Sequence, residues 1–136
     1  MADTGYNWDA AWTPIDAAIT LTTGATVDDT SAVISLDGKA ACEVSIDADY
    51  SDAAMTGAGL KVYLLRDVNG TDYEALLDQP WHFEMPFAQN LTRRRAFKVD
   101  PSDMGSFKIL LYWWNTTASS VVVATSVRYA TIPVAS

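Results

Sequence analysis

The residue types that carry most enzyme chemistry are scarce in this sequence. It holds one cysteine, Cys42, and one histidine, His82, so an internal disulfide, a multi-thiolate metal site and a His–His zinc motif are all excluded. A histidine-activated nucleophile would need His82. Cys42 lies in a segment that we expect to be buried, where a thiol packs as an inert apolar group. The glycine-rich nucleotide loops and the GxSxG elbow are also missing from the sequence. We therefore expect no catalytic residues and no cofactor.

Carboxylates offer a second kind of chemistry, but their spacing fits no known site. Asp47, Asp49 and Asp52 follow the pattern D-x-D-x-x-D. A calcium loop of the EF-hand type needs glycine at its sixth position and glutamate at its twelfth. Counting from Asp47, those positions hold Asp52 and Ala58. A glycosidase needs two carboxyl groups across an aromatic cleft, and nothing in the sequence links the glutamates. We expect no metal site and no enzyme.

The charges of the chain are strongly unbalanced. Seventeen acidic and nine basic residues give a net charge of −8, a field that repels nucleic-acid phosphates, so we expect no nucleic-acid partner. Residues 1–58 hold ten of the acids and one base, Lys39, whereas residues 93–98 hold four of the nine bases. Such polarity lets copies of the chain, or the chain and a partner, meet with opposite signs. It is also typical of two solvated surfaces.

Aromatic and arginine side chains are the groups that point to a function. Tryptophan, tyrosine and arginine are the preferred anchors of protein interfaces, aromatic rings also stack on sugars, and a sandwich needs large side chains in its core. Trp113 and Trp114 are consecutive, so in a strand they point to opposite faces, one to the core and one to the surface. The predicted partner-binding residues are Trp8, Trp12, Arg93, Arg94, Arg95, Trp113 and Trp114.

Alternation of apolar and polar residues predicts the strands that position these groups. Residues 40–50 are apolar on one side and mostly acidic or polar on the other, and residues 60–66 alternate nearly as well. Residues 107–114 are apolar on both sides, which is typical of a central strand covered by a loop or a neighbouring molecule. A tight hairpin is predicted at Asp37-Gly38. Further strands are predicted at residues 15–21, 32–36, 81–85, 94–99 and 121–132.

These strands and turns predict an all-β fold. We expect an antiparallel β-sandwich of about eight strands, either jelly-roll or immunoglobulin-like. Residues 1–11 are predicted to form an extended N-terminal arm and residues 12–136 a single β-sandwich domain. No apolar run approaches the ~18–20 residues that cross a bilayer. The acidic start also lacks the apolar segment of a secretory signal, so we expect no membrane association.

Three segments of the chain together resemble a known group of proteins. They are LRDVNGTDYE at residues 65–74, PWHFEMP at residues 80–86 and TRRRAFKVDP at residues 92–101. This pattern resembles small virion proteins encoded in the structural gene clusters of tailed bacteriophages. The resemblance implies a non-enzymatic structural part, either a decoration (cement) protein of the head or a neck, tail or fibre component. It carries over no catalytic residues.

A decoration protein needs a rigid β scaffold and contact surfaces rather than a reactive cleft. We therefore predict a capsid decoration protein that binds the major capsid protein shell, or other virion proteins, and stabilises the head. We expect a homo-oligomer such as a trimer, located on the capsid exterior of the virion after synthesis in the host cytoplasm. The alternatives are a carbohydrate-binding β-sandwich module and a neck, tail or fibre component.

Overall fold

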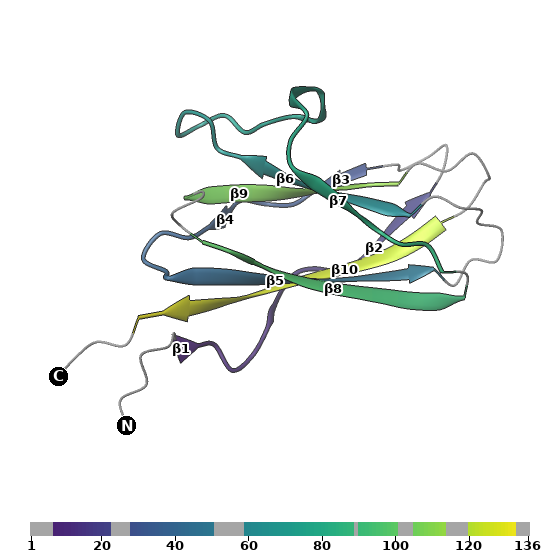
Figure 1. Ribbon diagram of the computed structural model, residues 1–136, viewed down its shortest axis with the longest axis horizontal. Helices are drawn as coiled ribbons and strands as arrows, with labels where there is room; N and C mark the ends of the chain where they lie inside the picture. The colour runs from purple at the N-terminus through teal and green to yellow at the C-terminus, as the bar shows by residue number, and fades with distance from the viewer. Residues whose placement is uncertain are drawn as a thin grey trace.

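Two antiparallel sheets stacked face to face make up the fold (Figure 1). The computed structural model describes residues 7–22, 28–50, 59–88, 90–100, 105–113 and 120–132. Ten strand segments and one 3-10 turn, η1 (Leu76–Asp78), lie in these ranges, and no α-helix does. The predicted all-β sandwich is therefore confirmed.

The first sheet, sheet A, is built from the long strands of the molecule. Its strands lie in the order β1-β10-β5-β8, and β2 pairs with the same edge of β10 as β1 does. The bounds are β1 (Asn7–Trp8), β2 (Thr13–Thr22), β5 (Ala41–Tyr50), β8 (Leu91–Val99) and β10 (Ser120–Thr131). β1 falls within the predicted arm, where it pairs with the last residues of β10.

The second sheet, sheet B, has shorter strands. Their order is β3-β9-β6-β7, and β4 also pairs with β9. The bounds are β3 (Asp28–Thr30), β4 (Ile34–Ser35), β6 (Leu60–Arg66), β7 (His82–Met85) and β9 (Ser106–Tyr112). A helix long and apolar enough to cross a membrane is not found in the described ranges.

The strand order decides between the two predicted architectures. With the two-residue strands β1 and β4 set aside, the sheets read β2-β10-β5-β8 and β3-β9-β6-β7. Every connection between these eight strands crosses from one sheet to the other, except the connection from β6 to β7. An immunoglobulin-like sandwich keeps more consecutive strands paired within one sheet. The arrangement is therefore jelly-roll-like.

The hairpin predicted at Asp37-Gly38 is wrong, although the turn itself is present. Gly38 has a φ of +73°, a left-handed conformation that glycine adopts without steric cost, and the Lys39 N–H donates to the Leu36 carbonyl at 2.9 Å. The strands on either side do not pair with each other. β4 pairs with β9 in sheet B, whereas β5 pairs with β10 and β8 in sheet A. The turn therefore carries the chain between the sheets.

The core lies between the two sheets, and strand alternation fills it. The apolar side of β5 from Cys42 to Tyr50 is buried, as are Leu60, Val62 and Leu64 of β6, so the inner faces predicted for these strands are confirmed. Trp113, which follows β9, is the largest fully buried side chain among the described residues. Burial of such side chains is the main stabilising contribution, each supplying about 1.5–3 kcal/mol.

Tyr50 connects the two sheets through hydrogen bonds. Its hydroxyl donates to the Met85 carbonyl at 2.7 Å and accepts from the Leu60 N–H at 2.9 Å. Burial raises the pKa of Tyr50 to about 12, so the hydroxyl keeps its proton. Gly59 lies against the same Met85 carbonyl, where any side-chain carbon would clash. A residue of sheet A thus satisfies two backbone groups of sheet B.

The outer face of sheet B is also apolar, and the chain covers it. Tyr63, Leu65 and Leu110 are buried there and form a second, smaller cluster with Tyr73 and Leu76 of the β6–β7 connection. This connection rises above sheet B in Figure 1. The two-sided apolar pattern of residues 107–114 therefore marks a strand covered by a loop, one of the two predicted explanations.

Candidate functional site

The three consecutive arginines of β8 belong to two different surfaces. In the register with β5, Arg94 lies opposite Asp47, whereas Arg93 and Arg95 lie opposite Ala48 and Ile46. Directly opposed residues share a face of the sheet, and Ala48 and Ile46 are core residues. Arg94 therefore belongs to the outer face of sheet A. Arg93 and Arg95 belong to its inner side, at the edge of the sandwich.

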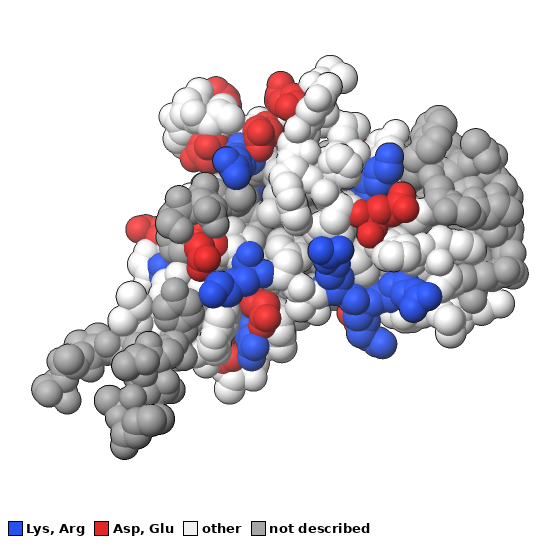
Figure 2. All heavy atoms as spheres, viewed as in Figure 1, with Lys and Arg blue, Asp and Glu red and all other residues white. Residues whose placement is uncertain are grey.

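Charged side chains of both signs cover the outer face of sheet A. The Arg94 Nε lies 3.4 Å from an oxygen of Asp47, and the Arg94 side chain is 70% exposed. Farther along, Glu43 of β5 lies opposite Lys98 of β8 on one side and Arg128 of β10 on the other. Figure 2, which views the sandwich from the edge where β8 lies, shows basic side chains gathered over β8. We call this surface, from β8 across β5 to β10, the outer A face.

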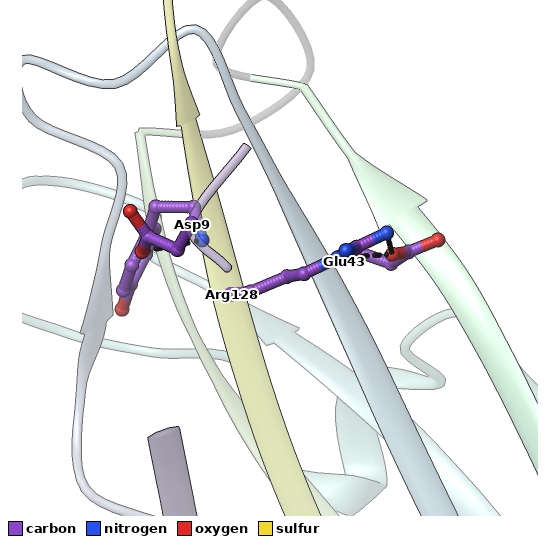
Figure 3. Close-up of polar contacts among 4 residues, drawn as sticks. Asp9, Glu43 and Arg128 are labelled. Carbon is purple, nitrogen blue, oxygen red and sulfur yellow. Dashed lines mark hydrogen bonds and ion pairs between the residues drawn. The ribbon is translucent and has the colours of Figure 1, made fainter. Parts of the chain in front are cut away.

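Arg128 contacts both Glu43 and the N-terminal segment on the outer A face. Its guanidinium donates through Nε and Nη2 to the same oxygen of Glu43, at 2.8 and 2.7 Å (Figure 3). The same group lies 5.1 Å from the ring centroid of Trp8 and 4.9 Å from that of Trp12. These are cation–π distances. Two tryptophans predicted to bind a partner therefore also fasten the N-terminal segment to the sheet.

Two hydrogen bonds between Asp9 and the backbone of Tyr129 hold the same segment in place. The Asp9 N–H donates to the Tyr129 carbonyl at 2.8 Å, and the Tyr129 N–H donates to the Asp9 carboxylate at 3.2 Å. Trp12 is still 37% exposed. The surface that it offers to a partner is therefore pre-positioned by the sheet beneath it.

Trp113 differs from the other described residues of the predicted set. Trp113 is fully buried in the core, so it supports the fold and offers no surface to a partner. The prediction that Trp113 contacts a partner is therefore corrected: Trp113 is a core residue. Trp114 lies outside the described residues.

A groove formed by β8, the end of β6 and Trp81, the residue just before β7, was not predicted from the sequence. It has a volume of about 280 Å³ and is lined by Arg66, Trp81, Arg95, Phe97 and Lys98, among others. Trp81 is 51% exposed, and its ring centroid lies 5.5 Å from that of Phe83. The Arg95 guanidinium lies 4.3 Å from the Phe83 centroid. We call this feature the β7–β8 groove. In the sequence, this groove is indicated by Arg95, Phe97 and Val99, which lie at alternate positions and therefore share one side of β8.

The residues considered for catalysis do not meet. Cys42 faces the core from β5, and burial followed by the charge of Glu43 raises the pKa of its thiol to about 12. His82 is exposed on the outer side of β7, where its ring packs 4.8 Å from Tyr63. No group of three or more His, Cys, Asp or Glu residues that could hold a metal ion occurs in the described ranges.

The fold therefore defines the protein as a jelly-roll β-sandwich. Comparisons with known proteins show a shared fold and no family. No protein-family model matches the sequence, and no curated protein matches it. A chain in the structure of deformed wing virus carrying the GFP gene is similar with a TM-score of 0.58 and 9% identity, over 93% of this chain and 47% of that chain. This protein thus spans about half the length of that viral chain.

Two further solved structures have lower scores. The CBM22-1 xylan-binding domain from Paenibacillus barcinonensis Xyn10C has a TM-score of 0.47 and 12% identity, over 90% of this chain and 87% of that domain. The SPBc2 prophage-derived protein YomS has a TM-score of 0.45 and 10% identity, over 94% of this chain and 98% of that one. At these identities, likeness shows the fold alone.

Proposed function

We propose that this protein is a non-enzymatic structural protein of a virion, a decoration protein of a tailed-phage head, that binds the shell through the outer A face. The observation that carries the proposal is the contrast between the outer faces of the two sheets. Sheet B buries its apolar outer surface under its own β6–β7 connection. Sheet A leaves charged side chains and the exposed part of Trp12 open to solvent.

The chemistry of the outer A face suits a protein partner. Arginine donates in pairs to carboxylates, and tryptophan and arginine dominate the energetics of protein interfaces. Arg94 is held near its position by Asp47, and Trp12 by Arg128. A surface fixed in advance loses less side-chain entropy when it binds. The phage-like segments of the sequence and the fold shared with a virus chain are consistent with this role.

Binding to particles tests the proposal. Particles of the encoding virus, stripped of this protein, are incubated with the wild-type protein, with Arg94→Ala and with Lys61→Ala, whose side chain belongs to sheet B. We expect Arg94→Ala to need about tenfold more protein for the same occupancy, and Lys61→Ala to match the wild type. Particles with bound protein should also resist heat better than stripped ones. Equal binding by both variants, or no binding by the wild type, would contradict the proposal.

A carbohydrate-binding module is the second candidate, and one feature favours it. A hollow of about 530 Å³ on the sheet B side is lined by Tyr63, Gln79, Pro80, His82 and Tyr112. Flat rings beside an amide are the groups that stack on sugars and hydrogen-bond to them. Trp81 adjoins this hollow in the chain, so titration with glycans should quench tryptophan fluorescence if sugar binds. A decoration protein should show no quenching until shell protein is added.

A further inference from the structure

The two long edges of the sandwich carry opposite charges. At one edge, β8 of sheet A contacts β7 of sheet B, and at the other edge β2 contacts β3. The β7–β8 groove lies at the first edge and has three cationic side chains in its lining, those of Arg66, Arg95 and Lys98. Asp16, Asp28 and Asp29 lie on the two strands of the second edge. We call the second edge the β2–β3 acidic edge.

No carboxylate in the described part of the chain neutralises the two arginines of the groove. Among the described residues, the ion pairs within 4.0 Å involve Arg94, Lys98 and Arg128, and neither Arg66 nor Arg95 has a carboxylate at that distance. Their apolar surroundings are Phe97 and the half-exposed ring of Trp81. Guanidinium groups next to exposed aromatic rings fit a partner that brings carboxylates.

The acids of the opposite edge crowd one another. Asp29 lies opposite Leu111 and Asp16 opposite Thr125, and both of these opposed residues are buried. Both aspartates are therefore on the inner side of their sheets, at the seam between β2 and β3. Burial, then the charge of Asp16, raises the pKa of Asp29. A cation from outside would relieve this repulsion, because the described ion pairs include none of these three acids.

The backbone at the acidic edge does not favour added strands. The pairing of β2 with β10 has register shifts on either side of Thr125, and Pro14 of β2 has no N–H to donate. Bulges and proline protect an edge strand against β-sheet extension. We therefore expect a contact at β2 to be made by side chains.

We propose that copies of this protein associate head to tail, with the β7–β8 groove of one copy against the β2–β3 acidic edge of the next. Arg66 and Arg95 pair with Asp16 and Asp29 of the neighbour, whose approach also covers Trp81. Such a contact joins two different surfaces, so each added copy leaves one edge of each kind open, and the assembly either closes into a ring or continues. The contact does not depend on what the assembled protein is attached to.

Charge reversal at adjacent arginines tests the contact. Arg95→Glu and Arg94→Glu change the net charge equally, but only Arg95 lines the groove. In sedimentation velocity at ~0.15 M salt, where distant charges are screened, we expect the wild type to associate with rising concentration. Arg95→Glu should weaken this association by about tenfold or more, and Arg94→Glu should not. Arg66→Glu, on the other wall of the groove, should repeat the effect, and thermal unfolding identifies any variant that fails to fold.

Mixing variants tests the head-to-tail geometry. Arg95→Glu has an intact acidic edge, and the double variant Asp16→Asn with Asp29→Asn has an intact groove. Each should fail to assemble alone, whereas an equal mixture should give dimers and nothing larger, because only one productive contact remains. A wild type that stays monomeric, an equal effect of Arg94→Glu and Arg95→Glu, or larger species in the mixture would overturn the proposal. Shell binding through the outer A face is measured separately with Arg94→Ala.

Discussion

The outer faces of the two sheets are built on opposite principles. On sheet B, apolar side chains such as Leu65 and Leu110 are buried beneath a connection of the same chain. On sheet A, charged side chains lie at the surface, as in the exposed ion pair of Arg94 with Asp47. The first face stabilises the fold, because apolar area is removed from water. The second contributes little to folding, because exposed ion pairs are worth only about 0–1 kcal/mol. Such a face is free to serve binding.

The core shared by both faces gives the largest expected effect. Trp113→Ala should lower the free energy of unfolding by about 3–5 kcal/mol, because it empties a large, fully buried site. Urea unfolding followed by circular dichroism measures the change. If the variant instead kept wild-type stability and lost only partner binding, Trp113 would be a contact residue and not a core residue.

A matched pair of substitutions compares the two outer faces directly. Leu110→Ala on sheet B should cost about 2–3 kcal/mol, because the residue is buried under Leu76 and Tyr73. Ser126→Ala on the outer side of β10 should change stability by less than ~0.5 kcal/mol. Denaturant midpoints of the two variants provide the test. Similar losses at both positions would show that sheet A is also covered in the folded chain.

The hydrogen bonds between the sheets should have an intermediate effect. Tyr50→Phe leaves the Leu60 N–H and the Met85 carbonyl without their shared partner, which should cost about 1–3 kcal/mol. Amide hydrogen exchange at Leu60 should accelerate in the variant beyond the change expected from global stability. Unchanged exchange at Leu60 would mean that water replaces the hydroxyl without cost.

Within the outer A face, one arginine should matter for folding and the other for binding. Arg128→Ala removes the ion pair with Glu43 and both tryptophan contacts, so it should cost about 1–2 kcal/mol. Arg94→Ala should stay within ~0.5 kcal/mol of the wild type, since its ion pair is exposed. Thermal unfolding of both variants is the measurement. The reverse ranking would contradict the roles assigned to them.

The smallest expected effect is a gain in stability. The raised pKa of Asp29 means that its ionised form is disfavoured in the folded state, so Asp29→Asn should be more stable than the wild type by about 0.2–0.5 kcal/mol at neutral pH. Folding of the wild type should strengthen as the pH falls through the raised pKa. The advantage of the variant should therefore vanish below the ordinary value of 3.8. A constant advantage at all pH values would point to a cause other than ionisation.

Local patterns predicted the strands well, and non-local pairing accounts for what they missed. Alternation located β5 and β6 with their buried sides, because that pattern is a property of the segment itself. β3 contains two aspartates and has weak β-propensity, and it exists because β9 provides its partner. The Asp37-Gly38 turn was predicted correctly in position, but which strands it joins depends on sheet order.

The candidate site followed the same rule. The sequence alone could have placed Arg94 and Arg95 on opposite faces of β8. Phe97 and Val99 mark the inner side of the strand, and Arg95 lies on the same side as they do. The contacts of Arg128 with Trp8 and Trp12 join opposite ends of the chain, so no local pattern could reveal them. The same holds for the β7–β8 groove, which combines side chains from two strands, β6 and β8, with Trp81 of the β6–β7 connection.

The proposed role as a decoration protein is tested most directly by cryo-electron microscopy of virions purified from a lysate that contains this protein. The sandwich should be found on the head exterior, with Arg94 and Trp12 against the shell and the β6–β7 connection turned away from it. Virions that lack the protein, or particles on which it is bound through the sheet B side, would contradict the account.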